Sequence, residues 1–184
     1  HSYWFFATAD CTVNLVAGTG VGTGGEELRS NRPRAQSPSA PPDDIDALVA
    51  GNTAFALALY RVISEQDGNL FASPYSISVA LGMTYAGARA ATETQMADTL
   101  RFILPQSALH PAFNTLDLEL ASRGEGASGL DGDPFRLHVV NQLWGQRDHS
   151  FLPAFLDTLS VNYGAGVRLL DFQTSPETCR HEIN

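Results

Sequence analysis

Lysine is missing from this chain of 184 residues, and all 11 basic side chains are arginine. Schiff-base and P-loop chemistry are excluded, because both need an amine. Positive charge is also outweighed, since 20 acidic residues give a formal net charge of −9. Nucleic acids and anionic membrane surfaces are therefore not expected partners, because phosphate groups are bound by clustered positive charge.

Cysteine and long apolar runs are scarce as well. Cys11 and Cys179 stand near opposite ends of the chain, are too few for a disulfide-built scaffold, and are expected to be lone thiols. No apolar run approaches the roughly 20 residues of a transmembrane helix, so no membrane span is expected. With 43% hydrophobic and 17% charged residues, the chain has the composition of a globular protein.

Residues 1–42 lack the periodicity of a folded segment. The first nine are aromatic without a basic region, so we expect an irregular leader, with the remnant of an export signal ahead of Cys11 as the alternative. Five glycines between positions 18 and 25 and four prolines between 33 and 42 predict a flexible linker. We therefore expect residues 1–42 to be disordered and one folded domain to occupy residues 43–184.

Helical periodicity begins at Ile45. The apolar positions of residues 45–62 fall on one stripe, which predicts a helix with one buried face. Asp43 or Asp44 is expected to cap this helix and Gly68 to end it.

Two further helix starts carry specific capping signals. Ser73 at the N-cap with Pro74 at the first helical position predicts a helix, because proline lacks the amide that would be unpaired there. Thr92 and Gln95 form a capping-box pattern, so a third helix is predicted over about residues 92–103.

The rest of the chain mixes helices with strands. Apolar spacing predicts a helix over about residues 109–122, and alternation predicts strands over residues 135–146 and 167–172. A helix is expected near residues 151–159, and a Ser-Pro start predicts another from residue 175 that is still running at the last residue. The pattern is that of a mostly helical α+β protein.

Two short patterns resemble nucleotide and metal sites. Residues 20–25 match Gly-x-Gly-x-x-Gly, but no helix of useful length fits before Pro33, so the linker interpretation is favoured. Cys179-x-His181 has no recognised zinc spacing, and no metal or other cofactor is expected.

The sequence contains the residue types of a hydrolase triad, with Ser73 or Ser76 as nucleophile, His138 as base and Asp171 as the acid. Neither serine lies in a Gly-x-Ser-x-Gly elbow, and the start of a helix explains both. The chain is therefore not expected to be an enzyme, and no catalytic residue is assigned.

The residues Asn69-Leu70-Phe71-Ala72-Ser73-Pro74-Tyr75-Ser76-Ile77 resemble the serpin family, in which an Asn-x-Phe-x-Ser-Pro-x-Ser stretch opens helix B. Further matches follow in family order at Leu81, Gly87, Thr92–Met96, Asn141–Trp144, Phe151–Phe155, Asp171-Phe172 and Ile183-Asn184. The ordered series covers about residues 45–184 and makes the resemblance specific.

The resemblance implies the N-terminal, mostly helical part of the serpin fold, with helices A to F and strands one and two of sheet A. The chain would end inside helix F, so the domain is expected to be incomplete at its C-terminal end. Family motifs give structural roles to Asn69, Pro74, Gly87, Thr92, Asn141, Phe172 and Asn184.

The resemblance also implies a function. Inhibitory serpins are metastable and trap serine, and sometimes cysteine, proteases: the protease cleaves an exposed loop and is acylated, and the loop then inserts into sheet A. Ser73 and Ser76 would lie in the shutter beneath that sheet, where small hydroxyl groups can exchange hydrogen-bond partners as strands part. Helix capping explains Ser73 equally well.

Some family features fall outside the sequence. The reactive loop, which sets protease specificity, would lie beyond Asn184, so a non-inhibitory binding or structural module, or an inactive truncated product, is the alternative. Arg123 is the single basic residue of the predicted fourth helix, so no glycosaminoglycan site is expected. Because serpins act mostly outside cells, the resemblance implies an extracellular or exported protein.

Overall fold

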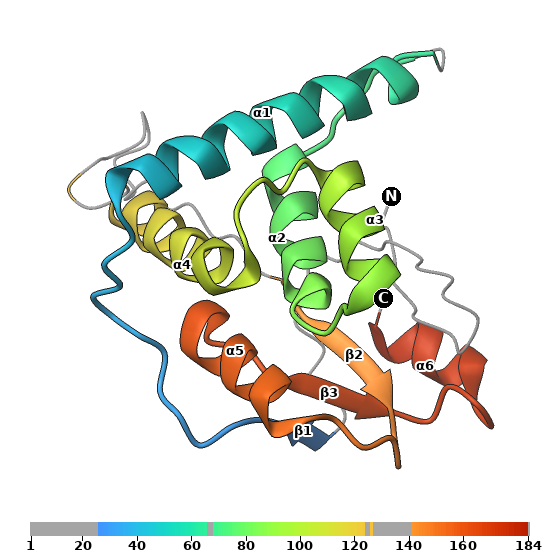
Figure 1. The fold of residues 1–184 in the computed structure, drawn as a ribbon. Coiled ribbons are helices and arrows are strands. Elements are labelled where there is room, and N and C mark those ends of the chain that lie inside the picture. The colour runs from blue at the N-terminus through green and yellow to red at the C-terminus, as the bar shows by residue number, and fades with distance from the viewer. Residues whose placement is uncertain (1–25, 66–67, 124–125, 127–140, 184) are drawn as a thin grey trace.

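The structure, a computed structural model, describes residues 26–65, 68–123, 126 and 141–183. Within these residues the elements follow in the order β1 (Glu26–Leu28), α1 (Pro42–Ile63), α2 (Pro74–Tyr85), α3 (Ala90–Leu100), α4 (Gln106–Ser122), β2 (Leu143–Gln146), α5 (Pro153–Tyr163), β3 (Val167–Leu170) and α6 (Pro176–Ile183). Figure 1 shows α1 lying across α2 and α4, with the sheet and α5 on the far side of α2. This arrangement confirms the predicted mostly helical α+β architecture.

Helix α1 starts and ends earlier than its sequence predicts. Its N-cap is Pro41, which offers no side-chain cap, and Asp43 and Asp44 lie inside the first turn instead of capping it. Carboxylates are still favourable there, because they face the positive end of the helix dipole. The helix ends at Ile63, so the expected stop at Gly68 is wrong.

Helix α2 begins as predicted. Ser73 has an extended backbone, its side chain accepts a hydrogen bond from the Ser76 amide, and Pro74 occupies the first helical position. The helix runs to Tyr85 and buries a face that includes Val79 and Met83.

The capping box predicted at Thr92 is wrong. Helix α3 already begins at Ala90, after Arg89 at the N-cap, so Thr92 lies within the first turn. Gln106, which follows α3, contacts this start: its side-chain amide donates to Ala88 O at 3.1 Å, and its Oε1 accepts from the Arg89 guanidinium at 3.3 Å. Helix α4 also starts earlier than expected, at Gln106.

The described sheet has three strands in the order β1-β3-β2. Strands β2 and β3 are parallel, with Leu143 opposite Val167. Of the strand predicted over residues 135–146, the structure gives β2, while residues 127–140 lie outside the described part. Strand β3 ends at Leu170, two residues before the predicted end at Phe172.

The expected linker is corrected in its second half. Residues 26–28 form β1, which pairs antiparallel with β3, and residues 29–40 continue as an irregular segment to α1. We call residues 29–40 the strap; in Figure 1 it is the blue segment that passes α5 and α4. The local sequence resembles a linker because the groups that hold the strap are far away in sequence. Residues 1–25 lie outside the described part.

Two clusters of buried apolar side chains form the interior. The helical core lies among α1 to α4 and comprises Leu48, Phe55, Val79, Tyr85, Ala88, Leu100, Phe102, Leu109, Ala112 and Phe113. The sheet core lies between α2, α5 and the sheet and comprises Met83, Leu156, Leu159 and Val167. The partly buried Tyr163 packs against both clusters.

Among the described helices, α1 alone is long and apolar enough to cross a membrane by length and composition. This differs from the expectation that no such stretch exists. Core helices of soluble proteins pass the same test, and α1 buries Leu48 and Phe55 in the helical core. The stretch is therefore weak evidence for a membrane span.

Candidate functional site

The start of α2 brings the two predicted shutter serines together. Ser73 Oγ lies 2.9 Å from Ser76 Oγ and 3.4 Å from the Ser76 amide nitrogen. Ser73 is exposed and Ser76 is half-buried. Each hydroxyl can donate or accept, so the pair can exchange partners without a change of charge.

A third serine of the same helix makes a deeper contact that the sequence analysis missed. Ser78 is fully buried and its hydroxyl donates to Asn52 Oδ1 at 2.7 Å, which ties α2 to α1. The buried Asn52 Nδ2 has no hydrogen-bond partner among the described residues. The sequence carries no local signal for this bond, because Ser78 and Asn52 are 26 positions apart.

A second polar group joins α4 to the end of α5. His110 Nδ1 lies 2.7 Å from the Tyr163 hydroxyl. Burial lowers the pKa of His110 to about 4, with a smaller contribution from the positive charge of Arg89. Burial also raises the pKa of Tyr163 well above its ordinary value. Both side chains are therefore neutral at physiological pH, as the apolar surroundings require.

Arg34 of the strap completes a polar network with α4. Its Nε donates to Asn114 Oδ1 at 2.8 Å, and its Nη2 lies 2.6 Å from Asp117 Oδ2. Asn114 is fully buried and donates in turn to the Ala35 carbonyl at 2.8 Å. This network was not predicted from the sequence, in which Arg34 lies within the expected disordered linker.

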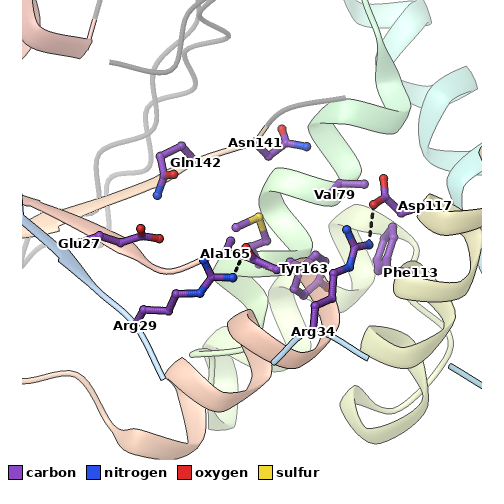
Figure 2. A pocket seen from close by; sticks show the side chains of 12 residues that line it. Glu27, Arg29, Arg34, Val79, Phe113, Asp117, Asn141, Gln142, Tyr163 and Ala165 are labelled. Atoms are coloured by element: carbon purple, nitrogen blue, oxygen red, sulfur yellow. Dashed lines mark hydrogen bonds and ion pairs between the residues drawn. The ribbon is translucent and has the colours of Figure 1, made fainter. Parts of the chain in front are cut away.

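A pocket of about 320 Å³ lies beside this network. Its apolar wall includes Val79 and Phe113, while Asn141, one of the predicted family positions, lines another side. Figure 2 shows the Arg34 side chain pointing across the pocket wall to Asp117. Arg34 and Asp117 of the wall are paired with each other, and the Arg29 guanidinium, which also lines the pocket, donates to the Gly164 carbonyl.

The other predicted family positions are dispersed. Asn69 and Thr92 are exposed on a loop and on α3, and Gly87 follows α2, where an added Cβ would lie 3.4 Å from the Phe155 ring. Phe172 is half-buried beyond β3. Asn184 lies outside the described residues. Of the predicted positions that the structure describes, Ser73, Pro74 and Ser76 are the ones that lie together, at the start of α2.

The possible hydrolase triad of a serine with His138 and Asp171 is not supported by the contacts of Asp171. Its carboxylate accepts hydrogen bonds from Thr174 and from Gln146 Nε2, at 3.3 Å for the latter, and these bonds lower its pKa. His138 lies outside the described residues. The described serines at the start of α2 bond to each other rather than to a base.

Comparison with known proteins gives consistent matches. A family model described as Serpin (serine protease inhibitor) matches residues 50–184. Leukocyte elastase inhibitor A of Rattus norvegicus is 35% identical over 142 residues, which are 76% of this chain and 35% of the rat protein. The leukocyte elastase inhibitor of Homo sapiens is 34% identical and that of Equus caballus 36% identical, with the same coverage. The chain spans 35% of the length of these curated relatives.

One solved structure with the same fold is cleaved kallistatin complexed with heparin. It matches with a TM-score of 0.53 and 26% sequence identity, over 71% of this chain and 38% of that chain.

Proposed function

The chain belongs to the serpin family, and on that premise we propose that it is the N-terminal portion of a serine protease inhibitor that traps its target by inserting a cleaved loop into the sheet. The family model is described as a protease inhibitor, which agrees at the level of the family with the expectation that the chain is not an enzyme. Location outside the cell stays a prediction, since none of the relatives' names supports it.

The observation that carries the proposal is the start of α2. Ser73 and Ser76 contact each other there, and Ser78 bonds to Asn52 in the next layer. Interchangeable hydroxyl partners suit a place where a sheet must open, because old hydrogen bonds can be replaced as they break. We propose that Ser73 and Ser76 act there as shutter residues, with the other family positions in structural roles.

The relatives suggest the first protease to test. Several are named leukocyte elastase inhibitors. We propose a serine protease of this specificity class as the target, with cysteine proteases as a second class. No glycosaminoglycan activator is proposed, because the last turn of α4 carries no basic residue and Arg123 beyond it pairs with Glu119.

The test uses the full-length protein that contains this chain. Mixed with leukocyte elastase, it should form a covalent complex that survives boiling in detergent, because an acyl-enzyme bond links the two chains. Cleavage as an ordinary substrate by elastase and by a panel of serine and cysteine proteases would contradict the inhibitory proposal. That outcome would favour a non-inhibitory binding or structural module.

The shutter assignment needs its own comparison. Ser76→Ala in the full-length protein should change the ratio of trapped to merely cleaved protease, since it removes a partner during sheet opening. Ser122→Ala is the matched control, because the Ser122 hydroxyl donates to a near neighbour on the same helix, the Glu119 carbonyl of α4. Equal ratios in the two variants would remove Ser76 from the proposed shutter.

A further inference from the structure

The strap carries more specific contacts than its composition suggests. Its three arginines each contact a different partner: Arg29 Nη2 donates to the Gly164 carbonyl at 2.5 Å, Arg32 lies 3.5 Å from Asp157, and Arg34 pairs with Asp117. These partners lie on α4, on α5 and just after α5. The strap is therefore attached at several points along its course.

The contact with α4 is the best protected one. The Arg34 and Asp117 side chains are only 21% and 30% exposed, against 60% and 37% for Arg32 and Asp157. Charge-assisted hydrogen bonds gain strength when water is kept away, so the Arg34 pair is the stronger of the two. Asn114 adds a neutral bond to the same guanidinium.

Backbone groups attach the strap to α5. The Ala35 amide donates to the Val161 carbonyl at 3.0 Å, and the buried Ser160 hydroxyl donates to the Arg32 carbonyl at 2.6 Å. These bonds satisfy polar groups at the end of α5 that burial would otherwise leave unpaired.

At its other end the strap continues from β1, which pairs with β3. Glu26 lies opposite Leu169, and Leu28 lies opposite Val167 of the sheet core. β1 and the strap together, residues 26–40, thus form one continuous segment that connects the sheet, α5 and α4. A shift of β2 and β3 relative to α4 and α5 must stretch or break it.

We propose that the strap is a conformational latch that fixes β3 against α4 and α5, with Arg34 as its main anchor. As a regulatory device it rests on the proposed function, in which the sheet must rearrange to accept an inserted strand. Release of Arg34 from α4 would free the β2–β3 pair to shift, and would make sheet rearrangement faster.

The experiment compares Arg34→Met with Arg32→Met in the full-length protein. Both substitutions remove one guanidinium from the strap, so they are matched in charge and in segment. Amide hydrogen exchange in β1 and β3 should become about tenfold faster or more in Arg34→Met and change little in Arg32→Met. Equal exchange in both variants would overturn the latch.

A second measurement tests its effect on inhibition. The rate of covalent complex formation with elastase should rise in Arg34→Met and not in Arg32→Met; an unchanged rate would overturn the regulatory role. A protein that traps no protease would refute the proposed function, while exchange in β3 would still decide the latch. If Arg34→Met does not fold, Arg34→Lys can replace it, because lysine keeps the charge and loses the planar guanidinium. Hydrogen exchange of the β1 and β3 amides should then be faster than in the unsubstituted protein, by less than the roughly tenfold expected for Arg34→Met.

Discussion

The helical core and the sheet core are assembled from different kinds of sequence. In the described part of the chain, the helical core has ten buried residues between Leu48 and Phe113, all on consecutive helices and the turns that join them. The sheet core has four, and they join Met83 to α5 and β3, far along the chain. The smaller cluster is supplemented by the polar contacts of the strap and of His110 with Tyr163.

The difference shows where each kind of interaction matters. Consecutive helices bury large apolar surfaces, so the helical core is stabilised mainly by packing. The sheet core has fewer apolar side chains and depends more on directional bonds between distant segments. A region held by directional bonds can change its arrangement by exchanging partners, as the proposed loop insertion would require.

The largest effect is expected from Phe113→Ala. Phe113 is 1% exposed and its ring packs against Phe102 at 5.8 Å and Tyr163 at 6.3 Å between centroids. Its truncation should lower the free energy of unfolding by about 3–5 kcal/mol, measured by urea denaturation. Phe71→Ala is the control, because Phe71 is 95% exposed and its change should stay within about 0.5 kcal/mol. Equal losses would mean that the helical core is not built on packing.

A pH dependence is expected next, at the junction of the two cores. Burial lowers the pKa of His110 to about 4, against an ordinary value of 6.5, so the folded protein binds fewer protons than the unfolded chain between these values. The stability contributed by the neutral ring is fully present above pH 6.5 and is lost as the pH falls toward 4. The loss should be about 2–3 kcal/mol.

The slope of unfolding free energy against pH measures this effect. His110→Phe should remove most of the slope between pH 6.5 and 4, since the ring no longer titrates, although it also loses the bond to Tyr163. His149→Phe, at an exposed position, should leave the slope in place. A slope that survives in His110→Phe would place its origin elsewhere.

Gly166→Ala tests the attachment of β1 at the sheet. A Cβ there would lie 2.7 Å from both Glu27 Oε1 and the Leu28 carbonyl oxygen, so β1 would have to move away. We expect a loss of about 1–3 kcal/mol in unfolding free energy and faster hydrogen exchange in β1. Gly87→Ala is the matched control, because its Cβ would meet the Phe155 ring at an ordinary 3.4 Å. Similar effects of the two changes would argue against a tight β1–β3 contact.

The helical core was largely predictable from the sequence. Apolar spacing gave α1 and α4 within a few residues, and Ser73-Pro74 located the start of α2, because both signals are local. The capping box at Thr92 misled, since α3 starts at Ala90, where Gln106 from beyond the helix bonds to Arg89 and to the Ala88 carbonyl. Local sequence patterns do not predict contacts between residues that are far apart in the chain.

The strap shows more clearly what a local sequence pattern cannot predict. Prolines and polar residues around Arg34 are typical of a linker, yet Arg34 bonds to Asp117, 83 positions along the chain. A single arginine gives no sign of which distant carboxylate it will meet. The candidate shutter serines could be named because their motif is contiguous, whereas the Ser78–Asn52 bond depends on how α1 crosses α2.

The smallest effect is expected from the serine pair itself. Ser73→Ala removes the N-cap of α2 and should lower the free energy of unfolding by about 1 kcal/mol. Ser73→Asp should keep the cap and most of that stability, because a carboxylate also accepts from the Ser76 amide and faces the positive end of the helix. If the serine acts only as a cap, the aspartate variant will also trap protease normally in the full-length protein. If it also exchanges partners in the shutter, the aspartate variant will be stable yet trap less, because a carboxylate can accept hydrogen bonds but cannot donate them.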